Sequence, residues 1–228
     1  MTAIAPTPDP AAATPDNSVT PDTSALDPAL PPPPGPPYAS AISAFRVLNR
    51  WFMVPAMRAG LGAWLSTPIG GYILLLGVRG RKSGLLRQTP LNYIVAEGSA
   101  WVLAGFGPQT QWYRNLLEDP RAAVVLPGRS SACVAAEVRD PAARARIVPS
   151  LLRSTGGPAL MAGVNPVTAT DGQIIEALAW VPLVRLSPVD GALESGPDDP
   201  GGKAWIWRQG LVLGATLVIL RGLWKVLR

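Results

Sequence analysis

The sequence contains no histidine among its 228 residues. Histidine is the commonest general base and a frequent metal ligand, so its absence excludes histidine-dependent catalytic triads and histidine-ligated zinc or haem. The single cysteine, Cys133, excludes a disulfide within the chain and a metal site of the CxxC type. Cys133 lies in an alternating apolar run, where we expect a core-facing strand residue rather than a nucleophile. We therefore expect no bound metal.

Acidic residues are missing from a long internal stretch. Asp27 and Glu97 enclose a segment without Asp or Glu that carries seven cations, namely Arg46, Arg50, Arg58, Arg79, Arg81, Lys82 and Arg87. An excess of one charge over such a length indicates an anionic partner. No nucleic-acid-reading module is recognisable, so we expect an anionic cofactor or a membrane surface and no nucleic acid.

A short basic turn lies between two apolar runs of strand length. It consists of Gly80, Arg81, Lys82, Ser83 and Gly84, with Arg87 three residues further on. The glycines allow positive φ and a close approach of backbone N–H groups to a ligand, and the serine adds a hydroxyl donor. The three cations are suited to phosphate or carboxylate oxygens. This pattern favours an anion-binding hairpin; the alternative is a solvated basic turn.

The N-terminal part divides into a tail and a helical segment. Residues 1–38 are rich in Pro and Ala and carry no cation, which predicts a disordered tail. Residues 41–53 predict a helix that Pro55 kinks or ends, followed by a short helical piece up to residue 65. We expect the helix to pack across the mouth of a barrel; the alternative is that it lies on anionic lipid.

The middle of the chain is predicted to be mainly β. Strands are expected over residues 72–79, 88–95, 100–104, 122–126 and 131–139, and these predict a small antiparallel barrel, with residues 182–186 as a last edge strand. Helices are expected over residues 111–118, 141–152 and 171–179. Asp140 is the predicted N-cap of the second, and Pro149 is expected to disturb its last turn.

The C-terminal part differs in character from the barrel segment. Residues 188–203 form a predicted acidic linker, and residues 204–228 form a predicted hydrophobic helix with tryptophans and cations at its ends. Residues 204–226 extend roughly 34 Å as a helix, but the uncharged part is only about 18 Å long. We expect this helix to attach the protein to the cytoplasmic side of a membrane, by spanning it or lying on it; packing on the barrel is the alternative.

Taken in order, several motifs resemble one family of enzymes. They are the basic turn with Arg87, then Pro90-Leu91, then Trp112-Tyr113-Arg114-Asn115-Leu116, then Asp119-Pro120. About residues 45–187 of the predicted domain, residues 39–187, are similar to the deazaflavin (coenzyme F420)-dependent nitroreductase family of split-barrel oxidoreductases. The resemblance implies an α+β, mainly β fold of the FMN-binding split β-barrel type, with flanking helices and the hydrophobic helix appended at the C-terminus.

The resemblance also implies roles for individual residues. Contacts with the phosphate and acidic tail of the coenzyme, an 8-hydroxy-5-deazaflavin, are implied for Arg81, Lys82, Ser83, Gly84 and Arg87. The loop with Gly105, Phe106 and Gly107 resembles a segment that lies against the deazaflavin, and Trp112 and Asn115 resemble a pair on the next helix. These two residues are three apart and share a helix face. FMN is the alternative cofactor.

The implied reaction is hydride transfer from the reduced coenzyme (F420H2) to an electron-poor acceptor, such as a quinone or a nitro compound. No side-chain base is compulsory for this chemistry, and Tyr93 and Tyr113 are the candidate proton donors. The loop lacks the family's serine, and Asn92 replaces a tyrosine, so the family does not fix the acceptor; the C-terminal helix favours a lipid-soluble quinone. One alternative function is a non-catalytic, membrane-tethered deazaflavin- or FMN-binding protein, and another is a lipid-binding scaffold.

Overall fold

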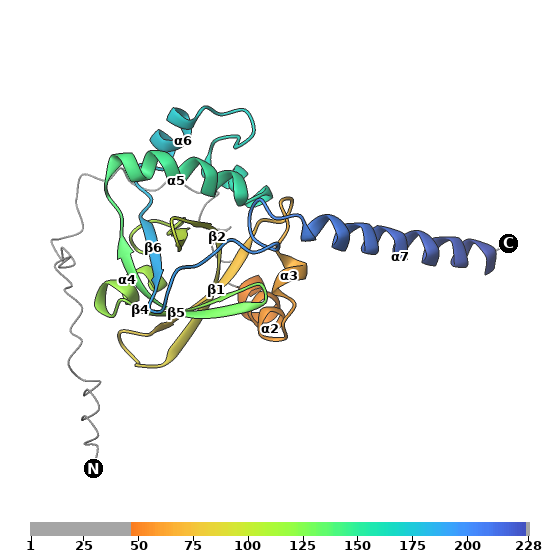
Figure 1. Ribbon diagram of the computed structural model, residues 1–228, viewed down its shortest axis with the longest axis horizontal. Helices are drawn as coiled ribbons and strands as arrows, with labels where there is room; N and C mark the ends of the chain where they lie inside the picture. Colours follow the sequence, from red (N-terminus) through yellow and green to blue (C-terminus); the bar gives the residue numbers. More distant parts are fainter. Residues whose placement is uncertain (1–46, 227–228) are drawn as a thin grey trace, which may run out of the picture.

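Six antiparallel strands close into a barrel in the order β1-β2-β3-β6-β5-β4 (Figure 1). The computed structural model describes residues 47–226, so the predicted N-terminal tail and the start of the first helix lie outside the described residues. The strands are β1 (Ile73–Arg79), β2 (Leu86–Ala96), β3 (Ser99–Leu103), β4 (Arg121–Leu126), β5 (Arg129–Glu137) and β6 (Leu183–Pro188). The predicted split-barrel fold with flanking helices and a C-terminal apolar helix is confirmed.

The position of β6 differs from the prediction. The short apolar run was expected to be an edge strand, but β6 pairs with β3 on one side and with β5 on the other. The prediction of an edge was wrong because a local pattern does not tell whether a strand has one neighbour or two. By pairing on both sides, β6 closes the barrel and removes two open sheet edges.

The core is divided between the inside and the outside of the barrel wall. Alternate residues point inward, as in β3, where Val102 belongs to the interior cluster and Trp101 to the cluster under the helices. Cys133 is 1% exposed and belongs to the interior cluster, which confirms the core-facing prediction. A thiol in this position is a packing group rather than a nucleophile.

Two helices cover one side of the barrel. They are α5 (Pro141–Ser154) and α6 (Asp171–Ala177), with the 3-10 helix η2 (Gly157–Ala162) between them (Figure 1). Asp140 is the N-cap of α5, since its carboxylate accepts from the Ala143 backbone N–H at 2.7 Å. The helix continues past Pro149 to Ser154, further than predicted, because its apolar face is buried against the barrel wall.

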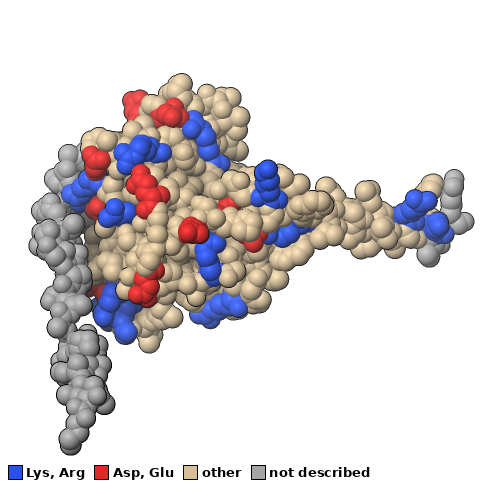
Figure 2. Space-filling model, in the orientation of Figure 1, with Lys and Arg blue, Asp and Glu red and all other residues tan. Residues whose placement is uncertain are grey.

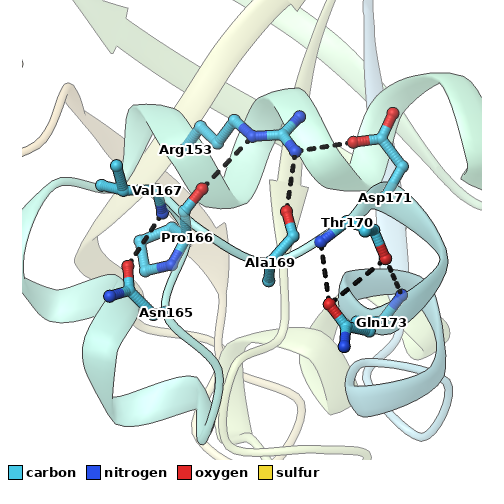
Figure 3. Close-up of polar contacts among 8 residues, drawn as sticks. All are labelled: Arg153, Asn165, Pro166, Val167, Ala169, Thr170, Asp171 and Gln173. Atoms are coloured by element: carbon cyan, nitrogen blue, oxygen red, sulfur yellow. Dashed lines mark hydrogen bonds and ion pairs between the residues drawn. The ribbon is translucent and has the colours of Figure 1, made fainter.

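Arg153 fixes the loop between η2 and α6 (Figure 3). Its guanidinium donates to the Pro166 carbonyl at 3.3 Å, to the Ala169 carbonyl at 3.4 Å and to the Asp171 carboxylate at 2.6 Å. Thr170 then begins α6 with a capping box that it forms with Gln173. A single cation from α5 therefore holds a Gly- and Pro-containing loop against the helix pair.

The segment before the barrel begins with helices, and Pro55 does not end the first of them. The π-helix η1 (Asn49–Met53) leads directly into α2 (Val54–Arg58), and a third helix, α3 (Gly62–Leu65), follows. Val54 donates its N–H to the Asn49 carbonyl five residues back. Pro55 occupies the first turn of α2, where its missing N–H is tolerated. The helix therefore does not end at Pro55, and a kink there stays a prediction.

The acidic segment between β6 and the last helix is tied to the barrel. Asp199 is 0% exposed, accepts from the Tyr93 hydroxyl and pairs with Arg129. Its neighbour Asp198 pairs with Arg208 in the first turns of α7 (Ala204–Val226). The sequence pattern predicted only a linker here. Two adjacent acids thus connect the barrel to the base of the helix.

We expect Asp199→Ala to lower the free energy of unfolding by about 3 kcal/mol, because it leaves a largely buried guanidinium without its counter-charge. Asp190→Ala is the matched control, since Asp190 is an exposed acid of the same segment, and it should change stability by less than about 0.5 kcal/mol. Chemical unfolding of both full-length variants in one mild detergent measures the difference. Equal effects would contradict a structural role for the buried acid.

Candidate functional site

A groove of about 730 Å³ lies beside the turn that joins β1 to β2. Its lining comes from this turn, from the first half of β2, from α4 (Gln111–Glu118) and from η1 and α2. Four of the described lining residues are cationic, namely Arg58, Arg81, Lys82 and Arg87, and none of the described lining residues is acidic. The groove therefore favours an anionic ligand.

The two glycines of the basic turn serve different purposes. Gly84 has φ +66°, in the left-handed region predicted for it, and it donates its N–H to the Gly80 carbonyl at 2.7 Å. Gly80 is not among the described glycines with positive φ. An added Cβ at Gly80 would lie 3.0 Å from the Ser83 hydroxyl oxygen and 3.2 Å from the Leu85 carbonyl oxygen. Gly80 is therefore required for space, and Gly84 for conformation.

Arg81 lies against α4, which the turn alone did not predict. Its backbone N–H donates to Asn115 Oδ1 at 3.3 Å, and its guanidinium donates to the same oxygen at 2.9 Å. A second guanidinium nitrogen donates to Gln111 Oε1 at 3.0 Å. The buried amide of Asn115 thus fixes the turn relative to the helix, and it leaves part of the guanidinium fork available to a ligand.

The remaining turn residues are exposed, and three of them, Lys82, Ser83 and Arg87, line the groove. Gly84 is exposed but is not among the described lining residues, so its implied contact with the coenzyme stays a prediction. Arg87 donates to the Ser83 hydroxyl at 3.3 Å, so β2 and the turn present this pair together. Exposed cations beside a small hydroxyl residue can rearrange around phosphate or carboxylate oxygens at little cost.

Trp112 and Asn115 lie on the same face of α4, as predicted from their spacing. Both are buried, and both line the groove. Trp112 also packs edge-on against Tyr113, with ring centroids 6.3 Å apart. Trp112 therefore serves the core and the groove wall at once.

The opposite wall of the groove contains residues that the sequence did not assign to the site. Asn49, Val54 and Arg58 come from η1 and α2, and Arg58 donates to Gln88 of β2 at 2.5 Å. The placement of Arg58 in the acid-free stretch was the available signal. Gln88 gave no signal, because a polar residue on a barrel strand is ordinary.

The glycine-containing loop after β3 does not line the groove. Gly107 has φ +77°, and an added Cβ there would lie 2.6 Å from the ring of Trp180. Gly105 and Phe106 are also absent from the groove lining. The structure therefore does not bring the loop together with the basic turn, and the cofactor contacts implied for it stay a prediction.

The two candidate proton donors also lie away from the groove lining. Tyr93 is buried inside the barrel, where burial and its hydrogen bond to Asp199 raise the pKa of the phenol far above its ordinary value. Tyr113 donates to Glu137 at 2.7 Å, and burial together with this bond raises its pKa as well. Both hydroxyls hold their protons firmly, so their proposed role receives no support from this geometry and stays a prediction.

Two further predictions concern metals and membranes. Among residues 47–226 there is no group of three or more His, Cys, Asp or Glu that could hold a metal ion. One helix of the same range, α7, is long and apolar enough to cross a membrane. The middle of α7 carries no charged side chain, and cations appear toward its far end (Figure 2).

Residues 52–156 match the model of a protein family described as F420H(2)-dependent quinone reductase. The family resemblance predicted from the sequence is confirmed. The matched segment extends from η1 to just beyond α5, and it contains the basic turn, β2 and α4. The match supports an F420H2-dependent reductase, and it covers every described groove-lining residue except Asn49. No curated protein matches the sequence.

Solved structures with similar folds were also found. A conserved hypothetical protein from Mycobacterium tuberculosis is 21% identical, over 58% of this chain and 81% of its own, with a TM-score of 0.42. A heme storage protein from Vibrio cholerae is 15% identical, over 62% and 90% of the two chains, with a TM-score of 0.38. A protein described as an F420-H2 dependent reductase is 18% identical, over 50% and 93%, with a TM-score of 0.34.

We expect Asn115→Leu to destabilise the protein by about 1–3 kcal/mol, because two donors of Arg81 lose their shared, buried acceptor. Gln111→Ala is the control on the same helix. Gln111 is exposed, so its loss should cost less than about 0.5 kcal/mol. Chemical unfolding gives the stabilities, and hydrogen exchange of the turn amides should become faster in Asn115→Leu alone. Unchanged exchange would show that the amide does not hold the turn.

Proposed function

We propose that the groove binds the phosphate and acidic tail of F420, and that the protein transfers a hydride from the reduced coenzyme to a quinone-type acceptor. The observation that carries the proposal is the four-cation groove, free of acids among its described lining residues, within the segment that matches the quinone reductase family. When bound, the reduced deazaflavin supplies the hydride. The protein then has to bind the coenzyme and the acceptor, orient them toward each other and exclude water from the reacting atoms.

The residues of the groove fit a ligand with a negatively charged tail. Arg81 is already oriented by Asn115 and Gln111, so little side-chain entropy is lost when it binds an anion. Ser83 and Arg87 lie side by side at the exposed end of the groove, where a phosphate can accept from both. Trp112 supplies an apolar, rigid wall.

The proposed acceptor is an electron-poor, lipid-soluble quinone, with nitro compounds as further substrates. The family description supports a quinone, and α7 supports attachment to a membrane, where such a molecule resides. Asn92, where a tyrosine was noted in the family, donates to the Tyr72 carbonyl at 3.2 Å. Asn92 therefore serves the strand framework, and the acceptor has to be recognised by other groups.

We expect Arg87→Ala to weaken F420 binding by about ten-fold to a hundred-fold, since it removes a charge-assisted hydrogen bond worth roughly 1.5–3 kcal/mol. The matched control is Arg146→Ala. Arg146 lies on α5 and forms an exposed ion pair with Glu97, so this variant removes the same charge outside the groove. Fluorescence titration of the deazaflavin measures both, with FMN titrated in parallel. Equal losses in the two variants would indicate a general charge effect and contradict a specific site.

Turnover separates an enzyme from a binding protein. We expect anaerobic oxidation of reduced F420 by a menaquinone analogue to be faster with the full-length protein in lipid vesicles than with the coenzyme and acceptor alone. The same rate with and without protein, together with tight coenzyme binding, would support the non-catalytic alternative. If FMN binds and F420 does not, the cofactor assignment is wrong.

A further inference from the structure

Large apolar side chains are exposed on the helical segment that precedes the barrel. We call the set formed by Trp51, Phe52, Leu61, Trp64 and Ile69 the apolar collar. Trp51 is 74% exposed and Ile69 is 75% exposed. The sequence favoured packing of this segment across the mouth of the barrel, yet these side chains face outward. Exposed tryptophans and isoleucine in one short segment indicate an interaction surface.

The apolar collar lies at the base of α7. Ser66, which directly follows α3, accepts through its carbonyl from Arg208 of α7 at 3.4 Å. In Figure 1, α3 and α2 lie on the side of the barrel from which α7 extends, and α4 lies on the other side. Beyond Gln209 the described part of α7 is exposed. The collar and the helix therefore share one face of the molecule.

No spacer separates the barrel from the apolar part of α7. Arg208 is held by Asp198 and by the Ser66 carbonyl, and the uncharged stretch begins at the next residue, Gln209. Each helical residue adds only about 1.5 Å. If α7 enters a bilayer, the surface around Ser66 must therefore come down to the lipid headgroups, and Trp64 and Ile69 come with it.

We propose that the apolar collar rests in the headgroup region of an anionic membrane, so that the barrel docks on the lipid and is not merely tethered to it. This inference rests on the membrane attachment through α7 proposed above. Aromatic side chains favour the membrane interface, and a segment without acids favours anionic lipid. Two copies meeting through this face would bring two acid-free, cationic segments together, which is unfavourable.

Docking through the apolar collar also has a consequence for the groove. The helical pair η1 and α2 carries both surfaces, since Asn49, Val54 and Arg58 line the groove while Trp51 and Phe52 are exposed. A collar in contact with lipid places one wall of the groove at the membrane surface. A lipid-soluble acceptor then reaches the groove from the bilayer without crossing water.

A matched pair of cysteine variants tests the orientation of the barrel. Leu61 belongs to the collar and is 47% exposed, whereas Leu117 is 50% exposed and belongs to α4, which lies on the other side of the barrel from α7 (Figure 1). Full-length Leu61→Cys and Leu117→Cys are labelled with an environment-sensitive fluorophore; the native Cys133 is buried and should not react. The vesicles contain phosphatidylcholine with a minor share of phosphatidylglycerol. Ile69→Cys gives a second, independent collar position.

We expect the label at Leu61→Cys to shift to the blue and to brighten by roughly twofold or more, because it moves to the headgroup–acyl boundary. The label at Leu117→Cys should not change. If both proteins float with the vesicles and neither label responds, α7 is a tether only and the docking proposal is wrong. If neither floats, membrane attachment fails as well, while coenzyme titration still tests the groove. A collar signal that grows with protein concentration without lipid would identify a second copy as the occupant.

Discussion

Closure of the barrel by β6 is the constraint on which the other features depend. Because β6 pairs with both β3 and β5, it joins the two outer strands of the sheet β3-β2-β1-β4-β5 into a closed barrel. β1 pairs directly with β2 and with β4, so the turn that carries the cations is held in the wall of this closed barrel. It also commits the chain after β6 to run back along the barrel, where Asp199 is buried against Tyr93 and Arg129. The groove and the base of α7 are both positioned by this closure.

Within that frame, the groove is organised by polar contacts rather than by apolar packing. Asn115 accepts hydrogen bonds from both the backbone N–H and the guanidinium of Arg81, so α4 and the basic turn are held together. Arg58 makes the corresponding link between α2 and β2 through Gln88. Both links join cations to neutral amides, so the positive charge of the groove is kept for a ligand and is not neutralised by carboxylates. The groove differs in this respect from the Asp198–Arg208 and Asp199–Arg129 pairs, in which each cation is neutralised by a carboxylate and stabilises the fold.

The prediction from the sequence was most accurate for locally determined features. Helix α4 has the predicted bounds, the C-terminal helix begins at the predicted residue, and the Asp140 cap is present, because spacing and capping act over a few residues. Features that depend on distant contacts were missed. The loop with Gly107 faces Trp180, about seventy residues away in the chain, rather than the basic turn. Tyr93 is held by Asp199, and a strand pattern contains no information about that partner.

The sequence by itself determined the kind of protein: a histidine-free chain with an acid-free basic turn, whose ordered motifs are those of deazaflavin-dependent reductases and whose C-terminal helix is apolar. These properties depend on residue types and short spacings, which are the same however the helices and strands are arranged in space. Only the tertiary structure decided which cations share the groove, which tyrosines are withdrawn from it, and on which side the apolar collar and α7 meet. Those relations join residues far apart in the chain, and barrel closure, burial and paired charges set them together.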